Sequence, residues 1–270
     1  MQYDPIKRHL GEIFNRTPFL RKVFYGLLDL LLLRAWHVHR ELRKWMSTAE
    51  KNANVLDAGA GFGQYTYWLH AKNKNLDILS VDVKEEQVAD CNRFFASIGA
   101  DKVKFEIADL TQFHHDNHFD LILSVDVMEH ILEDVQVFKN FHRSLRDKGM
   151  LVISTPSDQG GSDVHGEGES SFIEEHVRDG YNIKEIEDKL RSAGFSQVHA
   201  RYSYGAPGKI SWRISMKYPI LFMGKVPKAL GLLVLPFYYL IAYPFAYVLN
   251  MLDCRMNHPT GTGLIVTAVK

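Results

Sequence analysis

A glycine-rich turn is the first part of this sequence whose residue types indicate chemistry. The stretch VLDAGAGFG places Asp57, Gly59, Gly61 and Gly63 where an expected strand gives way to an expected helix. Glycine suits such a turn because the backbone takes positive φ angles there and because a ligand must approach the bare main chain. The alternative is a tight turn that binds nothing, and residues further along the chain argue against it.

Acidic residues also follow the next two expected strands. Asp82 lies at the end of one strand, in LSVDV, where a carboxylate can accept hydrogen bonds from both hydroxyls of a ribose. Asp109 lies at the end of the next, in EIADL, where a carboxylate is placed to meet the amino group of an adenine. Open α/β sheets bind ligands at the carboxyl ends of their strands. Acidic residues at three successive strand ends therefore predict a ligand-binding edge.

The elements that must position these residues alternate between strand and helix. Strands are expected at residues 54–58, 77–81, 103–108, 119–125 and 150–155, and helices at 63–71, 84–98 and 132–145. Such alternation implies a parallel sheet with right-handed crossovers, so the expected fold class is α/β. A helix at 183–193 and strands at 197–204 and 263–269 complete the pattern. Residues 18–46 show helical spacing that fits one long helix or two shorter ones.

The arrangement resembles the class I S-adenosylmethionine (SAM)-dependent methyltransferases, whose first motif is an acidic residue followed by GxGxG. It differs from the GxGxxG fingerprint of NAD-binding proteins in the spacing of its glycines. The resemblance covers about residues 52–204 and the last strand. It implies SAM as cofactor and a Rossmann-like, mostly parallel seven-stranded sheet with an antiparallel last strand. Carried over position by position, it implies a cofactor site of Asp57, Gly59, Gly61 and Gly63 around the methionine end, Asp82 and Val83 at the ribose, Asp109 and Leu110 at the adenine, and Val125.

The stretch SVDVMEHI after the fourth strand is similar to the ubiquinone-biosynthesis O-methyltransferases of the methyltransferase type 11 group. Those enzymes carry an E-x-x-E-H pattern that is described as holding a divalent cation, and the matching positions here are Asp126, Glu129 and His130. Carboxylate and imidazole groups could hold Mg²⁺ against a chelating oxygen acceptor. We prefer the other interpretation, in which these residues shape the acceptor pocket without a metal and His130 is a candidate catalytic residue.

The polar loop after the fifth strand supplies further candidates for contact with the acceptor. Methyl transfer from a sulfonium is an in-line displacement, so the enzyme chiefly aligns the acceptor with the methyl group. A phenol, alcohol or ammonium acceptor also needs a base, which makes His165 and His176 catalytic candidates. Arg178 could bind an anionic head group, and Tyr181 is a further substrate candidate. The alternative is a solvated polar loop whose histidines have no special role.

The zero net charge of the chain conceals a segregation of charge along it. Residues 1–51 contain ten basic and five acidic residues, whereas residues 52–204 contain 15 basic and 26 acidic ones. Residues 205–252 contain five basic residues and no acidic residue. Because the two basic segments are also the most apolar, they indicate an anionic membrane surface as partner and not nucleic acid.

The segment between the last two expected strands is unusual for its apolar length. Its residues 229–251 carry no charge over 23 residues, which is long enough to span a bilayer as one helix. A single crossing would separate the last strand from its sheet, so the segment must return to its starting side or never cross. Pro236 and Pro244 are expected break points. We expect a re-entrant hairpin or interfacial helices, with an apolar lid packed on the domain as the alternative.

These features together predict an organisation and a function. The expected parts are a basic, apolar helical region at 1–51, a SAM-binding core at 52–204, the apolar insert at 205–258 and a final core strand at 259–270. Two cysteines and the absence of a secretory signal pattern indicate a reducing compartment. We expect a cytoplasmic methyltransferase, peripheral or monotopic at the inner face of the membrane, that acts on a hydrophobic, membrane-borne acceptor such as a lipid, quinone or isoprenoid-like molecule. Two alternatives stay open, namely a soluble methyltransferase of a free apolar small molecule and a non-catalytic SAM-binding membrane adaptor.

Overall fold

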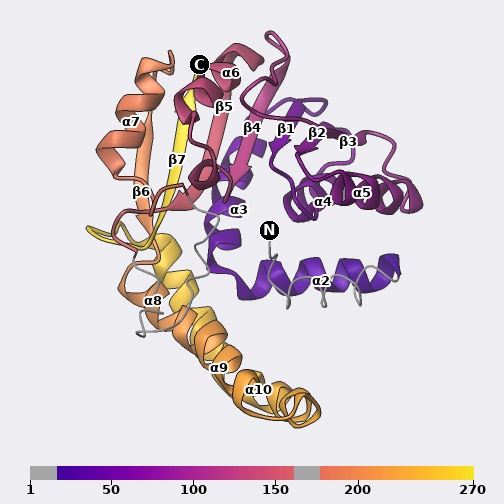
Figure 1. Cartoon of the computed structure of the whole chain (residues 1–270), viewed down its shortest axis with the longest axis vertical. Coiled ribbons are helices and arrows are strands. Elements are labelled where there is room, and N and C mark those ends of the chain that lie inside the picture. The colour runs from indigo at the N-terminus through magenta and orange to yellow at the C-terminus, as the bar shows by residue number, and fades with distance from the viewer. Residues whose placement is uncertain (1–16, 161–176) are drawn as a thin grey trace.

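A seven-stranded mixed sheet forms the centre of the computed structural model, which describes residues 17–160 and 177–270 (Figure 1). The strands are β1 Asn54–Ala58, β2 Asp77–Asp82, β3 Val103–Ile107, β4 Phe119–Val125, β5 Leu145–Pro156, β6 His199–Ser203 and β7 Gly263–Val269. They lie in the order β3-β2-β1-β4-β5-β7-β6. The first five strands run parallel, and β7 is antiparallel to both β5 and β6. The expected α/β fold is confirmed, including the antiparallel last strand.

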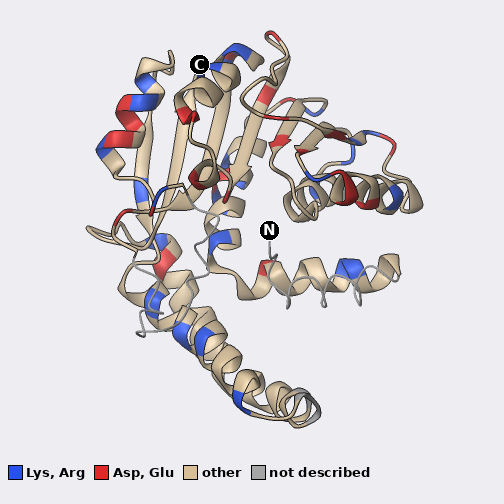
Figure 2. Cartoon of the chain, in the orientation of Figure 1, with Lys and Arg blue, Asp and Glu red and all other residues tan. Residues whose placement is uncertain are grey.

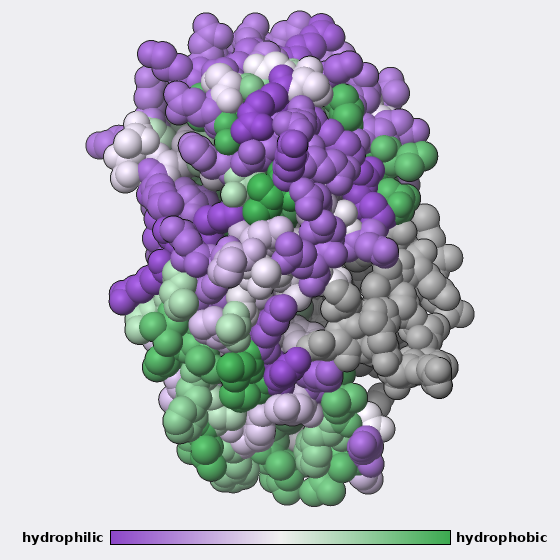
Figure 3. Space-filling model, turned by 90° about the vertical axis from the view of Figure 1, so that its left-hand side faces the viewer, coloured by the Kyte–Doolittle hydropathy of each residue, from purple (hydrophilic) through white to green (hydrophobic). Residues whose placement is uncertain are grey.

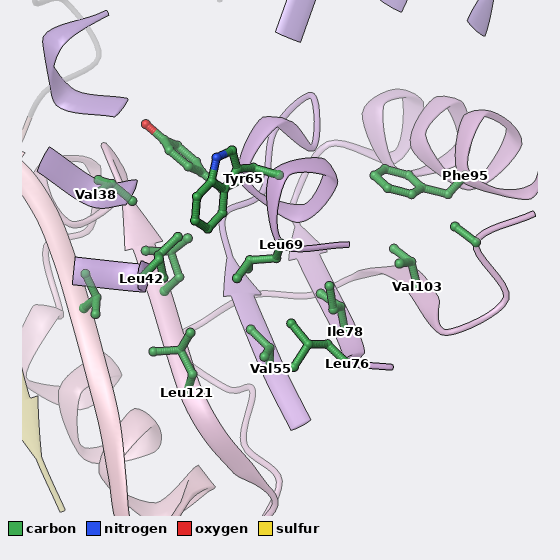
Figure 4. Close-up of a cluster of buried hydrophobic side chains, with 14 of the residues drawn as sticks. Val38, Leu42, Val55, Tyr65, Leu69, Leu76, Ile78, Phe95, Val103 and Leu121 are labelled. Atoms are coloured by element: carbon green, nitrogen blue, oxygen red, sulfur yellow. The ribbon is translucent and has the colours of Figure 1, made fainter. Parts of the chain in front are cut away.

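Helices cover both faces of the sheet. The helical elements are α2 Pro18–Leu31, α3 Leu33–Met46, α4 Gln64–Lys72, α5 Glu85–Ser97, η1 Met128–His130, α6 Asp134–Ser144, α7 Ile183–Ser192, α8 Ala206–Trp212, η2 Arg213–Lys217, α9 Tyr218–Lys225 and α10 Lys228–Arg255. Side chains of α3, α4 and α5 pack in one apolar cluster, and those of α6 and α7 pack in a second cluster. Alternate strand residues feed the two clusters, since Val55 belongs to the first and Leu56 to the second. Figure 4 shows the first cluster, where Val38 and Leu42 of α3 and Leu69 of α4 lie over the strands.

The N-terminal helical region consists of two helices. Leu32 is extended and separates α2 from α3. The Oγ1 atom of Thr17 accepts a hydrogen bond from the amide of Leu20, and Pro18 follows at the first helical position, so α2 has a favourable start. Of the two forms that the sequence allowed, the structure adopts the pair of shorter helices.

The apolar insert folds as a helical hairpin. Elements α8, η2 and α9 run out along one arm and α10 returns along the other (Figure 1). The hydroxyls of Tyr238 and Tyr239 donate to the carbonyls of Ile214 and Ser215 at 2.7 and 2.8 Å, which joins the two arms. Helix α10 is also long and apolar enough to cross a membrane, by length and composition.

The expected break points of the insert are wrong in the structure, because α10 continues through Pro236 and Pro244. The chain turns instead at Val226, which is extended and precedes Pro227. A residue before proline avoids the helical region, so this position is a natural end for α9. Each internal proline removes one backbone hydrogen bond from α10, yet the helix continues through both positions.

Both ends of the hairpin are attached to the same edge of the sheet. Gly263 at the start of β7 pairs with Pro156 at the end of β5 and with Ser203 at the end of β6. Since β5 runs parallel to β1, β2, β3 and β4, this is the edge formed by the carboxyl ends of those strands. The chain therefore returns to its starting side, as the topology required.

Candidate functional site

The glycine loop between β1 and α4 lies at this carboxyl edge. Gly59, Gly61 and Gly63 have φ angles of +80°, +53° and +76°. A Cβ atom on Gly59 would lie 2.2 Å from Val127 Cγ2, and one on Gly63 would lie 3.0 Å from Phe105 Cζ, so neighbouring side chains exclude larger residues there. A Cβ atom on Gly61 would meet no atom within 4 Å. The space beside Gly61 is what a ligand on the bare backbone requires.

Two carboxylates hold the loop in place. Asp57 at the end of β1 is buried and accepts a hydrogen bond from Thr66 Oγ1 at 2.6 Å. Burial raises the pKa of Asp57 to about 6. Asp82 at the end of β2 accepts hydrogen bonds from the amides of Gly61 and Lys84, both at 2.9 Å. A carboxylate can accept about four hydrogen bonds, so Asp82 retains capacity for ribose hydroxyls.

The residues predicted for the nucleoside end lie on neighbouring strands. Asp82 of β2 pairs with Ile107 of β3, which brings the following residues Val83 and Asp109 to adjacent strand ends. The side chains of Val83 and Asp109 are exposed, whereas Leu110 is buried. An exposed apolar side chain beside an acceptor carboxylate fits an adenosine group. Together with the open space at Gly61, these residues fit SAM.

The residues that the sequence predicts for the acceptor pocket follow the end of β4. Asp126 has a φ angle of +52° and forms an ion pair with Arg34 of α3. Glu129 in η1 is buried, and its Oε2 accepts a hydrogen bond from Thr155 Oγ1 at 3.1 Å. Burial raises the pKa of Glu129 to about 7. His130 is exposed on the same short helix. Among residues 17–160 and 177–270, no three acidic, histidine or cysteine side chains are grouped as a metal would need.

The two substrate candidates, Arg178 and Tyr181, both form hydrogen bonds to Asp134. Arg178 donates to Asp134 Oδ2 at 2.6 Å and to the carbonyl of Ile131 at 2.7 Å. The Tyr181 hydroxyl donates to the same Asp134 oxygen at 2.7 Å, and its ring is fully buried. Both side chains therefore fasten the chain after the polar loop to the start of α6. The catalytic candidates His165 and His176 lie outside the described residues.

The structure shows contacts from α2 to the glycine loop that the sequence did not predict. Arg21 is buried and donates to the carbonyl of Phe62 at 3.0 Å and to Asp90 Oδ2 at 2.5 Å. Tyr25, one turn later, also donates to the Phe62 carbonyl. Phe62 lies between Gly61 and Gly63, so these contacts from α2 hold the glycine loop in place. A basic residue and a tyrosine four residues apart in an apolar helix are the only signal for this role in the sequence.

The chain is similar to known methyltransferases in sequence and in fold. A family model described as "Methyltransferase domain" matches residues 49–200. Phosphoethanolamine N-methyltransferase 3 of Arabidopsis thaliana is 27% identical over 204 residues, which are 72% of this chain and 36% of that protein. (S)-coclaurine N-methyltransferase of Papaver somniferum is 23% identical over 148 residues, 55% of this chain and 39% of that protein. The chain thus spans little more than a third of the length of these two relatives.

A solved structure has the same fold. It is phosphoethanolamine N-methyltransferase 2 of Haemonchus contortus in complex with S-adenosyl-L-methionine, with a TM-score of 0.62 and 15% sequence identity. The similarity covers 97% of this chain and 60% of that chain. At this identity the match is evidence for the fold.

Proposed function

From the premise that the chain belongs to the methyltransferase-domain family, with SAM as its cofactor, we propose that it methylates a hydrophobic acceptor held in a membrane. SAM carries a methyl group on a sulfonium, which an acceptor atom displaces in line. The protein's own work is to hold the acceptor in that line and to exclude water.

The observation that carries the proposal is the exposure of the hairpin. Phe237, Leu240 and Ile241 of α10 are 66%, 76% and 70% exposed. Figure 3 shows hydrophobic residues gathered over the hairpin end of the molecule, while the sheet end is hydrophilic. Soluble monomers rarely expose a continuous apolar surface of this kind, which marks sites of membrane or protein interaction.

The charges on the hairpin favour a membrane over a protein partner. Figure 2 shows basic residues along the hairpin, and in sequence most of them lie in the arm formed by α8, η2 and α9, while residues 205–252 contain no acidic residue. Basic side chains beside an apolar surface complement an anionic leaflet. The inner face of a cytoplasmic membrane has this character, and we place the protein there as a peripheral or monotopic enzyme.

The base of the hairpin connects the membrane surface with the acceptor side. The amide of Arg34 donates to the hydroxyl of Tyr204, the residue that links β6 to the hairpin, at 3.0 Å. The guanidinium of the same Arg34 pairs with Asp126. These contacts bring Asp126 next to the base of the hairpin, which supports entry of the acceptor from that side.

For the acceptor atom, we favour nitrogen. The two curated relatives named above are N-methyltransferases by name. The carboxylates of Asp126 and Glu129 could hold a protonated amine before it loses its proton. A quinone or other oxygen acceptor, as the similarity to the ubiquinone-biosynthesis enzymes implies, is the second candidate.

The two alternative functions, a soluble enzyme with the insert as a lid and a non-catalytic adaptor, are less well supported. A lid that packs on the domain would bury its apolar side chains, whereas only 11% of the residues in the most apolar stretch of α10 are buried. The match to the methyltransferase family weighs against a non-catalytic adaptor, and measured turnover decides between the two.

Methyl-labelled SAM tests the proposal directly. Incubation of the full chain with membrane lipid extracts should label a lipid-soluble product, whose mass identifies the acceptor. The variant Leu240→Ser/Ile241→Ser should bind SAM normally and lose most of this activity. The variant Lys102→Gln/Arg191→Gln changes two exposed residues away from both the hairpin and the candidate site, and it should remain active. Label transferred only to water-soluble molecules, equally by all three proteins, would support the lid alternative instead.

A further inference from the structure

A cavity lies where α2, α3, α4 and α10 meet, away from the carboxyl edge of the sheet. Its volume is about 510 Å³, within the usual range for a small-molecule site. No residue of the glycine loop or of the strand ends lines it. Neither the proposed methyl transfer nor the core packing uses this cavity.

The cavity has a strongly basic lining. Arg40 and Arg43 of α3 and Arg255 at the end of α10 contribute three guanidinium groups, and Asp29 contributes one carboxylate. The Asp29 carboxylate already accepts a hydrogen bond from Gln64 Nε2 at 2.7 Å. In the described part of the chain, Arg43 and Arg255 have no carboxylate within ion-pair distance. The excess of positive charge favours an anion, and guanidinium groups match the oxygens of phosphate.

A buried histidine also faces this cavity. His39 is 4% exposed and lines it, and its Nε2 atom has no hydrogen-bond partner among the described residues, with Asp29 Oδ1 at 3.5 Å. Its ring stacks on Trp68 with centroids 4.3 Å apart, which fixes its orientation. Burial lowers the pKa of His39 to about 3, with Arg43 and Lys72 adding to the shift, so the ring is neutral. A neutral ring nitrogen of this kind can donate a hydrogen bond to an anion oxygen.

The remaining lining is apolar and leads to the hairpin. Leu30 of α2 and Tyr247 and Met251 of α10 lie on this side. Leu30 and Tyr247 are 42% and 45% exposed, and α10 continues from them to the exposed tip. An inorganic anion would leave this apolar wall without a contact, whereas the hydrocarbon part of an amphiphile would cover it.

We propose that this cavity binds the phosphate group of an anionic lipid, with the phosphate on Arg43, Arg255 and His39 and the chains along the wall towards the hairpin. This inference rests on the proposed function in one respect, because the membrane would be the source of the lipid. Such a site would dock the enzyme on a lipid bearing an exposed phosphate, separately from the acceptor that is methylated.

Binding of a short-chain phosphatidic acid, below its micelle concentration, tests the site without a membrane surface. Trp36 and Trp68 line the cavity, so quenching or a shift of tryptophan fluorescence reports binding. Arg43→Gln/Arg255→Gln should weaken binding by at least about tenfold, the usual effect of losing charged hydrogen bonds. Lys102→Gln/Arg191→Gln removes the same charge from two exposed sites elsewhere and should bind as the wild type does.

Two further probes separate the sources of the signal. Inorganic phosphate should bind much more weakly than phosphatidic acid, and the uncharged diacylglycerol of the same chain length should not bind. The proposal is overturned if phosphatidic acid does not bind, if both double variants weaken it equally, or if either probe binds as tightly as phosphatidic acid. Since the readout is binding and not methyl transfer, a failure of the proposed function would leave this result interpretable.

Discussion

The carboxylate of Asp253, near the end of α10, lies 2.8 Å from His37 Nε2 on α3, and both side chains are fully buried. Arg201 donates to His37 Nδ1 at 3.0 Å, so the proton of the neutral ring is on Nε2 and is donated to Asp253. The same carboxylate accepts from the amides of Gly208 and Tyr204 at 2.9 and 3.1 Å. One buried group thus fastens both ends of the hairpin to the N-terminal helices.

We therefore predict that Asp253→Asn destabilises the whole domain and not the hairpin alone. The amide of asparagine would replace an acceptor oxygen by a donor and leave buried donors facing each other. Loss of one member of a buried pair costs about 3–5 kcal/mol, and denaturant unfolding measures it. Asp116→Asn, which breaks an exposed ion pair with Arg143, is the control and should change little. A loss no larger than that of the control would show that the hairpin is only loosely attached.

The strands were largely predictable because their apolar runs have clear ends. Strands β1, β4 and β7 have the bounds that the sequence indicates, and a glycine or charged residue marks where each of them stops or starts. The largest difference is at β5, which begins at Leu145, five residues before the expected start. Residues 146–149, RDKG, are typical of a turn, yet Leu145 pairs with Phe119 of β4 across a shift in register. Pairing between strands overrode local preference there.

The two ends of β2 provide a matched test of the cofactor site. Asp82 lies at its carboxyl end beside the glycine loop, and Asp77 lies at the opposite end, paired with Lys102. Asp82→Ala should weaken SAM binding by about 1.5–3 kcal/mol, because hydrogen bonds to a charged group are lost. Asp77→Ala should leave it unchanged. Titration calorimetry with SAM and with S-adenosylhomocysteine measures both, and equal affinities for the two variants would remove Asp82 from the site.

The open space at Gly61 yields a further prediction. Gly61 and Gly99 both have positive φ angles, +53° and +69°, and a Cβ atom on either would meet nothing within 4 Å. Alanine at either position should cost about 1–2 kcal/mol of stability through backbone strain. Only Gly61→Ala should also weaken SAM binding, by at least about tenfold, because its methyl group would enter the ligand space. Thermal unfolding and SAM titration of the two variants separate strain from obstruction, and equal SAM binding by both would contradict this role of Gly61.

Stability should depend on pH through Glu129. Burial raises its pKa from 4.5 to about 7, so between these values the folded protein keeps a proton that the unfolded chain has lost. The stability of the wild type relative to Glu129→Gln should therefore fall as pH rises from about 4.5 to 7, at about 1.4 kcal/mol for each unit of pKa shift, and stay level above that. Denaturant unfolding at a series of pH values measures the difference, with Glu133→Gln as the control on the same loop. A difference that is constant with pH would contradict a buried, protonated Glu129.

Two features, one of the site and one of the insert, could not be predicted from the sequence, for different reasons. Arg178 and Tyr181 are residue types that often bind substrates. Only the fold shows that Asp134 accepts hydrogen bonds from both. The insert is one apolar segment in sequence, whereas in the structure its base is buried and its tip exposed. At the base Ser211 donates to Asn250 Oδ1 at 2.6 Å, and both side chains are buried. Composition alone does not separate apolar residues that pack on the protein from those that remain available to a partner.

The hairpin tip leads to the last prediction, which concerns the membrane. The protein should sediment with anionic vesicles and bind neutral ones more weakly, because basic residues near an anionic leaflet contribute on the order of 1 kcal/mol each. High salt should release only part of the bound protein, since it screens charges and leaves apolar burial in place.

Two variants separate the electrostatic part of vesicle binding from the apolar part. Lys209→Gln/Lys225→Gln should weaken the salt-sensitive part by on the order of 2 kcal/mol and make binding to anionic and neutral vesicles more equal. Leu240→Ser/Ile241→Ser should lose the salt-resistant part, because these exposed side chains would otherwise be buried in the acyl region. Ile107→Ser/Leu132→Ser, with comparable exposure at sites outside the hairpin, should bind as the wild type does. If the Leu240→Ser/Ile241→Ser variant bound vesicles as the wild type does, the tip would not be the membrane surface, and another occupant would have to cover it.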